Sequence, residues 1–245
     1  MNILAIGGGD KTEAIRSTLN SLPDEGTRVL LIPSACSIRG AYDRKVSSLQ
    51  KYFAEFGVAT SVLHEFDEAP TKTRIEHELG RASMLYTIGG NAPHMMQTLE
   101  SHGTDSAIFN AIRGGKTHAG TSAGALLPFR LMHSNVSARP SKEEWDFQFL
   151  EGLGLLPGVL AVHANQHDNT PNGPRPDSRL EHLVANFPLA AEFGLALDNG
   201  AAIRLGTNPA IFRATKESRA YLIQPAELEA TVWPLEDTAE LPDFS

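Results

Sequence analysis

The chain has 245 residues, of which 41% are hydrophobic and 20% charged, and its formal net charge is −8. This length suffices for one large domain with its own core, and Cys36, the single cysteine, excludes an internal disulfide framework. The acidic balance argues against a general nucleic-acid surface, which needs clustered Lys and Arg. No apolar stretch approaches the roughly 18 residues of a membrane span, and the first residues do not resemble a signal peptide. We therefore expect a cytoplasmic protein with a single domain over residues 1–245.

In the first half of the chain, short apolar runs alternate with longer amphipathic segments. Strands are expected at 2–7, 28–33, 60–66, 83–89 and 116–120, and helices at 12–22, 41–57, 73–80 and 92–103. Within 41–57, apolar residues recur every three or four positions, as on the buried face of a helix. This alternation implies parallel strands that are joined by right-handed crossovers.

The second half has fewer helical segments. Residues 157–165 are expected to form a strand, and 177–187 a helix with Asp177 as its N-cap. Closely spaced strands are then expected at 193–205, 210–214 and 219–224, with turns at Asn199-Gly200 and Thr207-Asn208. The sequence thus predicts an α/β fold, a three-layer αβα sandwich with a mostly parallel central sheet and antiparallel strands near the C-terminus.

The segment Gly120-Thr121-Ser122-Ala123-Gly124 fits the G-x-S-x-G pattern of a nucleophile elbow. Small residues on both sides of the serine let strand and helix approach closely, so that the turn exposes the hydroxyl at the carboxyl end of the strand. The start of the following helix would suit an oxyanion. The alternative is a glycine-rich packing turn in which Ser122 has no chemical role.

A second glycine turn, Gly89-Gly90-Asn91, also follows an expected strand and opens a helix. An oxyanion hole usually takes two donors from different segments, which pairs this turn with Ser122; otherwise it is simply a good turn. The N-terminal GGGDKTEA segment resembles a phosphate-binding loop. It lacks both the G-x-G-x-x-G spacing and a Walker lysine-serine pair, which argues against nucleotide binding.

Of nine histidines, His163 and His167 are the candidates for a catalytic base. We prefer His163, because it ends an expected strand and would lie at the same sheet edge as Ser122 if the strands are parallel. His163, His167 and Asp168 could instead bind a metal ion, but a loop context and the absence of an H-E-x-x-H motif argue against that role.

Asp198 is the candidate acid, because an aspartate at the end of a buried strand is costly unless it is paired. The alternative is turn chemistry, since Asp-Asn-Gly forms a good turn by itself. The order Ser122, His163, Asp198 argues against an α/β-hydrolase, in which the acid precedes the histidine. That arrangement would need an acid such as Asp146 ahead of His163.

Four segments, "YTIGGNAPHMMQTL", "HAGTSAGALL", "LGLLPGVLAVHANQ" and "GLALDNGAAI", resemble successive blocks of the peptidase E family. The family comprises cytoplasmic serine peptidases (aspartyl dipeptidases) that are related to cyanophycinases and share an amidotransferase-like fold. The resemblance covers roughly residues 28 to 205.

The resemblance implies that Ser122 is the nucleophile, His163 the base and Asp198 the acid, where several relatives carry glutamate. It implies oxyanion N–H groups from Gly90 and Ala123, and an acyl-enzyme mechanism that needs no cofactor or metal.

In aspartyl dipeptidases, an arginine after the histidine binds the N-terminal aspartate of the substrate. Here Pro176 takes that place, with Arg175 and Arg179 nearby, so we expect Asn91, Arg175 and Arg179 to bind substrate while Asp-Xaa specificity stays open.

We therefore expect a serine exopeptidase that acts on short peptides, without nucleic-acid or membrane partners; a homodimer remains an option. The alternatives are a cyanophycinase-like or other amide hydrolase on the same fold, and a non-catalytic small-molecule-binding protein.

Overall fold

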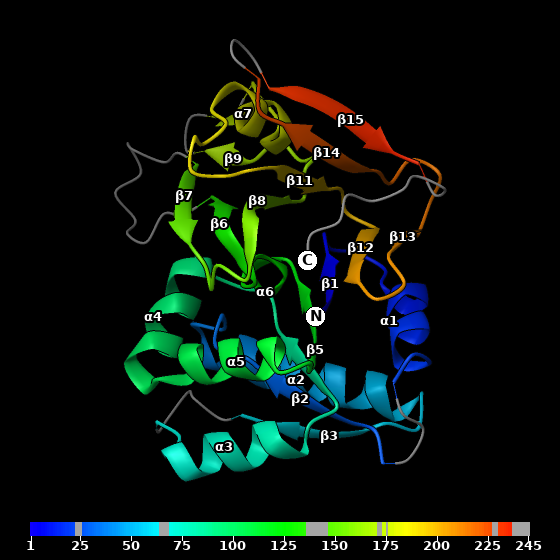
Figure 1. Ribbon diagram of the computed structural model, residues 1–245, viewed down its shortest axis with the longest axis vertical. Coiled ribbons are helices and arrows are strands. Elements are labelled where there is room, and N and C mark those ends of the chain that lie inside the picture. The colour runs from blue at the N-terminus through cyan, green and yellow to red at the C-terminus, as the bar shows by residue number, and fades with distance from the viewer. Residues whose placement is uncertain are drawn as a thin grey trace.

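The structure is a computed structural model and describes residues 1–22, 26–63, 69–135, 147–170, 173–174, 176–226 and 230–236. Within these residues, a seven-stranded sheet occupies the lower part of the molecule in Figure 1. Its strands are β1 (Asn2–Ile6), β2 (Arg28–Ile32), β3 (Ala59–Val62), β4 (Met84–Thr87), β5 (Thr117–Thr121), β12 (Ala201–Gly206) and β13 (Ala210–Arg213). The order is β13-β12-β1-β5-β4-β2-β3, parallel from β1 to β3 and antiparallel at β12 and β13.

A second, six-stranded sheet lies above the first in Figure 1. Its strands are β6 (Phe129–Ser134), β7 (Gln148–Glu151), β8 (Leu156–Val162), β11 (Gly194–Leu197), β14 (Ala220–Gln224) and β15 (Thr231–Leu235). The order is β15-β14-β11-β8-β6-β7, with β11, β8 and β6 parallel and the outer strands antiparallel. The short strands β9 (Asn169–Thr170) and β10 (Gly173–Pro174) pair with each other.

The described part of the chain has seven helices: α1 (Thr12–Leu19), α2 (Arg39–Ala54), α3 (Lys72–Arg81), α4 (Ala92–His102), α5 (Thr104–Arg113), α6 (Ala123–Leu126) and α7 (Arg179–Ala185). The first five cover both faces of the seven-stranded sheet, whereas α7 contacts β8 of the six-stranded sheet. The core residues of α1 and α2 cluster on one face, and those of α3, α4 and α5 on the other. The short helix α6 lies between the two sheets, where it contacts β5, β6 and β8.

Strand β1 shows how the sequence produces this layering. Ile3 and Ala5 join the core cluster under α3 to α5, whereas Leu4 and Ile6 join the cluster under α1 and α2. Side chains alternate between the faces of a strand, so a strand that is covered on both faces must be apolar at every position. The continuous apolar run of β1 is therefore the expected pattern for a central parallel strand.

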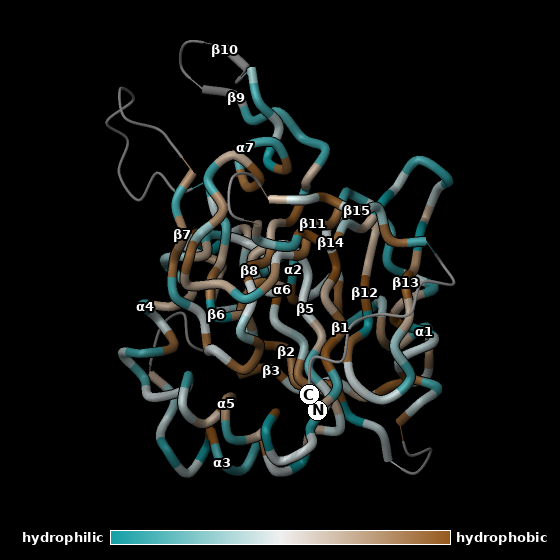
Figure 2. The backbone as a smooth tube through the Cα atoms, turned by 45° about the horizontal axis from the view of Figure 1, so that its top comes forward, coloured by the Kyte–Doolittle hydropathy of each residue, from teal (hydrophilic) through white to brown (hydrophobic). Residues whose placement is uncertain are grey.

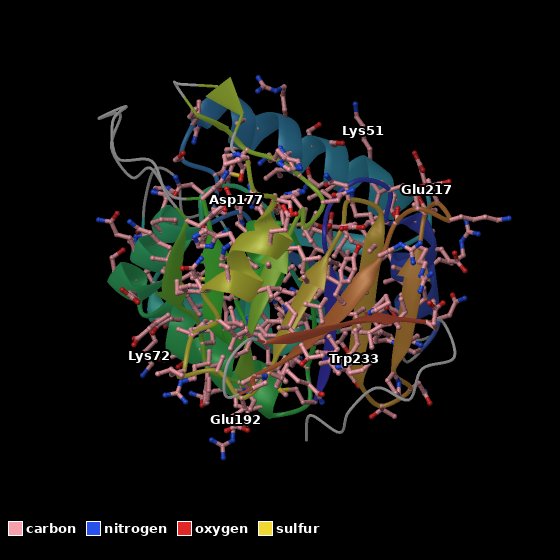
Figure 3. All side chains as sticks on the ribbon, turned by 90° about the horizontal axis from the view of Figure 1, so that it is seen from above. Lys51, Lys72, Asp177, Glu192, Glu217 and Trp233 are labelled. Atoms are coloured by element: carbon pink, nitrogen blue, oxygen red, sulfur yellow. The ribbon has the colours of Figure 1, made fainter. Side chains whose placement is uncertain are left out.

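The hydropathy pattern agrees with this arrangement. Hydrophobic residues concentrate along the central strands in Figure 2, while the outer helices carry hydrophilic stretches. Figure 3 shows Lys51 of α2 and Lys72 of α3 extending away from the sheets. Among the described residues, no helix combines the length and apolar character that a membrane span requires.

The expected class, an α/β fold with a mostly parallel core and antiparallel C-terminal strands, is confirmed. Its strands divide between two sheets, however. The apolar run 193–205 is two strands: β11 belongs to the six-stranded sheet and β12 to the seven-stranded sheet. The chain passes from one sheet to the other through Asp198, Asn199 and Gly200.

Two local expectations differ from the structure, and one helix has no counterpart among the expected elements. The helix expected after Ser122 is only α6, because Pro128 follows and the chain continues as β6. The N-cap of α7 is Ser178 in a capping box with Glu181, rather than Asp177. A separate helix, α5, begins directly after Gly103, whose φ of +66° ends α4. Residues 64–66 of the expected third strand lie outside the described residues.

Candidate active site

Ser122 occupies the single-residue turn between β5 and α6. Its φ of 54° and ψ of −125° lie in a region that non-glycine residues rarely adopt, at a cost on the order of 1–3 kcal/mol. The turn is held by hydrogen bonds from Ser122 N–H to the carbonyl of Ile6 (2.9 Å) and from Ala125 N–H to the carbonyl of Ser122 (2.9 Å). The backbone thus presents the serine hydroxyl at the carboxyl end of β5.

The two glycines of G-x-S-x-G let α6 pack closely against β5 and β4. A Cβ on Gly120 would lie 2.2 Å from the carbonyl oxygen of Gly124, and a Cβ on Gly124 would lie 2.1 Å from that of Thr87. Neither position has space for a methyl group. The motif therefore permits backbone contact on both sides of Ser122.

His163 lies directly beside Ser122. Its Nε2 is 2.9 Å from the Ser122 Oγ, and the residue follows β8 with a φ of 55°. Because β8 belongs to the six-stranded sheet and β5 to the seven-stranded sheet, the two side chains meet between the sheets rather than along one sheet edge. His167, the other candidate base, is exposed.

The second nitrogen of the His163 ring contacts Asn199, not Asp198. Nδ1 lies 2.6 Å from the Asn199 Oδ1. An amide oxygen only accepts hydrogen bonds, so this contact places the imidazole proton on Nδ1 and leaves the Nε2 lone pair facing the Ser122 hydroxyl. That tautomer is the one a general base requires.

Asp198 binds the backbone at Arg219, just before β14. Its Oδ2 accepts a hydrogen bond from the backbone N–H of Arg219 (3.1 Å), and the side chain is 2% exposed. Burial raises the pKa of this carboxyl, against the opposing hydrogen bonds from the backbone N–H groups of Arg219 and Asn165. Among the residues that the structure describes, His163 therefore has a hydrogen bond with Asn199 and none with the expected acid, Asp198. Asp146 lies outside the described residues.

The N-terminal glycines pack against this turn rather than forming a phosphate loop. A Cβ on Gly8 would lie 2.4 Å from the Asn199 Oδ1 and 2.6 Å from the His163 Cε1. Gly8 also has a φ of +141°, and its carbonyl accepts a hydrogen bond from Gly200 N–H (2.7 Å). Gly8 thus leaves room for the His163–Asn199 pair, a role that sequence reasoning missed because the contact spans most of the chain.

The surroundings of His163 favour its neutral form. Burial lowers the pKa of this imidazole, and the hydrogen bond with Asn199 opposes the shift. A neutral imidazole at physiological pH can accept the proton of a serine hydroxyl.

Two backbone N–H groups near Ser122 are available to a ligand. Ala123 begins α6, so its N–H has no partner within the helix. Gly90 lies against the loop after β2, where a Cβ would be 2.1 Å from the carbonyl oxygen of Ala35. Neither N–H has a hydrogen-bond partner among the described residues. Asn91, an expected substrate contact, is the N-cap of α4 and accepts a hydrogen bond from His94 N–H.

Arg179 forms an internal ion pair. It is 6% exposed and donates two hydrogen bonds to the buried carboxylate of Asp168, from Nε (2.8 Å) and Nη2 (3.0 Å). Because this guanidinium is already paired with a buried carboxylate, the structure gives no support to the expected role of Arg179 in substrate binding. Arg175 lies outside the described residues.

A cavity of about 510 Å³ opens beside Ser122. Its lining comes from the start of α1, from α2, from the end of β4 and from the serine turn: Lys11, Arg44, Lys45, Ser48, Leu49, Tyr86, Ile88, Gly89, Gly90, Thr121 and Ser122. The cavity therefore combines the nucleophile, a candidate oxyanion donor and three cationic side chains, in a chain whose net charge is −8.

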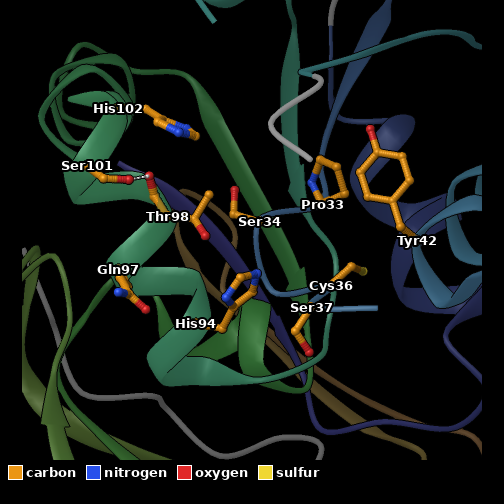
Figure 4. A pocket seen from close by; sticks show the side chains of 10 residues that line it. All are labelled: Pro33, Ser34, Cys36, Ser37, Tyr42, His94, Gln97, Thr98, Ser101 and His102. Atoms are coloured by element: carbon orange, nitrogen blue, oxygen red, sulfur yellow. Dashed lines mark hydrogen bonds between the residues drawn. The ribbon is translucent and has the colours of Figure 1, made fainter. Parts of the chain in front are cut away.

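A second cavity of about 360 Å³ adjoins the same loop after β2 (Figure 4). It lies between that loop and α4, with Ser34, His94 and Thr98 among its lining residues. Neither Ser122 nor His163 lines it. The geometry described above therefore belongs to the first cavity.

A serine on a strained strand-to-helix turn, beside a histidine and two available backbone N–H groups, is the arrangement of a serine hydrolase. The comparisons with known proteins narrow this class. The chain belongs to peptidase family S51, a family of serine peptidases, because the model of that family matches residues 3–211.

Similarity to individual proteins extends over nearly the whole chain. The chain is 24% identical over 251 residues to Peptidase E of Streptomyces coelicolor, covering 99% of this chain and 96% of that protein. It is 25% identical over 244 residues to the uncharacterized peptidase YgaJ of Bacillus subtilis, covering 95% and 96%. The crystal structure of a peptidase from an acI-B1 Actinobacterium has the same fold, with a TM-score of 0.72, 17% identity and coverage of 97% of this chain and 95% of that one.

Proposed function

We propose that this chain is a serine exopeptidase that hydrolyses short peptides, with Ser122 as nucleophile, His163 as general base and Asn199 in the third position. The observation that carries the proposal is the continuous hydrogen-bonded series Ser122 Oγ, His163 Nε2, His163 Nδ1, Asn199 Oδ1, with distances of 2.9 and 2.6 Å. The similarity to proteins named Peptidase E and YgaJ peptidase supports a peptide substrate. An Asn in the third position has a counterpart in the Cys-His-Asn arrangement of papain-like proteases.

The proposed reaction proceeds through an acyl-enzyme. Ser122 Oγ attacks the peptide carbonyl while His163 Nε2 takes the hydroxyl proton, and the N–H groups of Gly90 and Ala123 bind the oxyanion. His163 then gives the proton to the leaving amine as the C–N bond breaks. A water molecule, deprotonated by His163, attacks the ester and releases the acyl group together with the Ser122 hydroxyl.

The cavity beside Ser122 suggests where the acyl group binds. His163 must reach the leaving amine, so the leaving group lies on the His163 side of Ser122. The cavity is lined by Ser122 and Gly90 but not by His163. We therefore place the acyl residue of the substrate in the cavity.

The charges in the cavity favour an acidic acyl residue. Arg44 forms no ion pair with any residue that the structure describes. Burial lowers the pKa of Lys11, and nearby Asp10 opposes the shift only in part, so a bound carboxylate would stabilise the charged amine. These cations replace Arg179 as the basis for Asp-Xaa specificity.

Two measurements test the proposed function. A fluorophosphonate probe should label the wild-type protein at Ser122 and should not label Ser122→Ala, and this substitution should lower kcat by more than about 10⁴-fold. A panel of Asp-Leu, Ala-Leu and β-Asp-Arg should give the highest kcat/KM for Asp-Leu. Preference for β-Asp-Arg would instead support a cyanophycinase-like hydrolase. Absence of both labelling and hydrolysis in a folded protein would support a non-catalytic binding protein.

A further inference from the structure

Lys45 contacts the peptide group that carries one of the two proposed oxyanion donors. From α2, its Nζ donates a hydrogen bond of 2.6 Å to the carbonyl oxygen of Gly89. The carbon of that carbonyl is bonded to the nitrogen of Gly90, so Gly89 O and Gly90 N–H belong to one peptide group. Lys45, one of the three cationic residues that line the cavity, therefore binds the same peptide group that carries the proposed oxyanion donor.

A planar peptide group transmits this contact directly. The described residues contain no cis peptide bond, and in a trans peptide the C=O and N–H groups point in opposite directions. Fixing the direction of Gly89 O therefore fixes the direction of Gly90 N–H. A cation on the carbonyl also polarises the peptide, which makes the N–H a stronger donor.

The neighbouring contacts of this turn involve the α-carbon of Gly89 and the N–H group of Asn91 rather than the Gly89–Gly90 peptide group. Gly89 packs on the serine turn, where a Cβ would lie 2.6 Å from the carbonyl oxygen of Thr121. Asn91 N–H binds the carbonyl of Ala35 at 2.8 Å. Among the described residues, the Gly89 carbonyl has one other contact besides Lys45, a weak one with the thiol of Cys36 at 4.0 Å.

We propose that Lys45 is a positioning residue for the oxyanion hole, which aims and polarises the Gly90 N–H through the Gly89 carbonyl. The proposal rests on the function proposed above. A charge that acted only by attracting an acidic substrate would alter KM for acidic substrates alone. A positioning role instead lowers kcat for acidic and neutral substrates by the same factor, because the oxyanion forms with both.

The test compares Lys45→Met with Lys45→Arg and with Lys51→Met. Lys51 is an exposed lysine on the same helix that extends outward in Figure 3, so its replacement removes the same charge without touching the cavity. We expect Lys45→Met to lower kcat on both Asp-Leu and Ala-Leu by about tenfold or more, less than the roughly 10²–10³-fold loss from deleting an oxyanion donor. KM for Ala-Leu should stay unchanged, Lys45→Arg should recover most of kcat, and Lys51→Met should behave as wild type.

A peptide boronate that forms a tetrahedral adduct with Ser122 provides a second readout. Its affinity for Lys45→Met should fall by the same factor as kcat, with an unchanged thermal unfolding temperature. An unchanged kcat, or an effect confined to KM for Asp-Leu, overturns the positioning role while leaving the proposed function intact. A wild-type protein that neither hydrolyses peptides nor reacts with the fluorophosphonate overturns both proposals.

Discussion

The Asn199 Oδ1 lies 2.6 Å from the His163 Nδ1, while the neighbouring Asp198 is buried against the backbone of Arg219. The imidazole is therefore oriented by a neutral amide rather than by a carboxylate. A carboxylate in this position stabilises the imidazolium that forms during acyl transfer, whereas an amide mainly fixes the tautomer and ring orientation. The pH dependence of the enzyme should reflect this difference.

Replacing Asn199 should separate orientation from charge. Asn199→Ala should lower kcat by at least about tenfold, but by less than the roughly 10⁴-fold typical of losing a buried triad acid. Its acid limb of kcat/KM should move to lower pH, because the hydrogen bond that is lost in this variant raises the pKa of His163 in the wild type. Asn199→Asp should move the limb to higher pH, because the added charge favours the imidazolium. Limbs that shift in the same direction would contradict this role.

Replacing Asp198 should affect stability more than catalysis. Burial raises the pKa of its carboxyl above the ordinary 3.8, so the folded protein binds this proton more tightly than the unfolded chain. Wild-type stability should consequently decrease as pH rises from about 3.8 through the raised folded pKa. In Asp198→Asn this decrease should be missing, so its melting temperature should rise relative to wild type across that window.

The same variant also tests the catalytic assignment. Asp198→Asn should retain most of the wild-type kcat, because its side chain does not contact His163. A large fall in kcat, with an unchanged melting temperature, would return Asp198 to the acid position that the sequence suggested.

Gly8 offers a test of the close packing behind the His163–Asn199 pair. Gly8→Ala should abolish most activity, because its Cβ would lie within 2.6 Å of both side chains. Gly57→Ala is the matched control, since Gly57 also has a positive φ, of 72°, but a Cβ there would meet no described atom within 4 Å. Both variants carry backbone strain, and only Gly8→Ala should lose kcat and fluorophosphonate labelling. Equal loss in both would indicate that strain alone is responsible.

The sequence predicted those parts of the site that depend on local pattern. The spacing of Gly120 and Gly124 around Ser122 reflects the close approach of these two glycines, which are only four residues apart. The short apolar run before His163 likewise showed where its strand ends. The structure places the Ser122 and His163 side chains 2.9 Å apart. In contrast, the sequence does not show whether Asp198 or Asn199 contacts His163, because that depends on the direction of each side chain in the turn. A carboxylate is the usual partner of a catalytic histidine, so the sequence favoured Asp198.

Contacts between distant segments could not be predicted from the sequence either, because they depend on how the strands and helices pack together. The sequence indicates a turn at Asn199-Gly200 within 193–205, but only the strand partners, β8 before the turn and β1 after it, show that the two halves belong to different sheets. The need for glycine at position 8 comes from contacts with residues 163 and 199. Arg179 carries the charge that a carboxylate ligand requires, so the sequence suggests substrate binding. Its pairing with Asp168 becomes apparent only when β8 and α7 pack together in the fold.

Two arginine variants should distinguish structural from substrate-binding charge. Arg179→Met leaves the buried carboxylate of Asp168 unpaired, which should destabilise the fold by about 3–5 kcal/mol without changing the ratio of kcat/KM for Asp-Leu to that for Ala-Leu. Arg44→Met removes an exposed cation of the cavity and should lower that ratio while leaving the unfolding free energy nearly unchanged. Denaturant unfolding and the two-substrate assay measure both quantities on each protein. If Arg179→Met lowers the ratio and Arg44→Met does not, the acidic residue of the substrate binds on the Arg179 side, and the cavity beside Ser122 has another role.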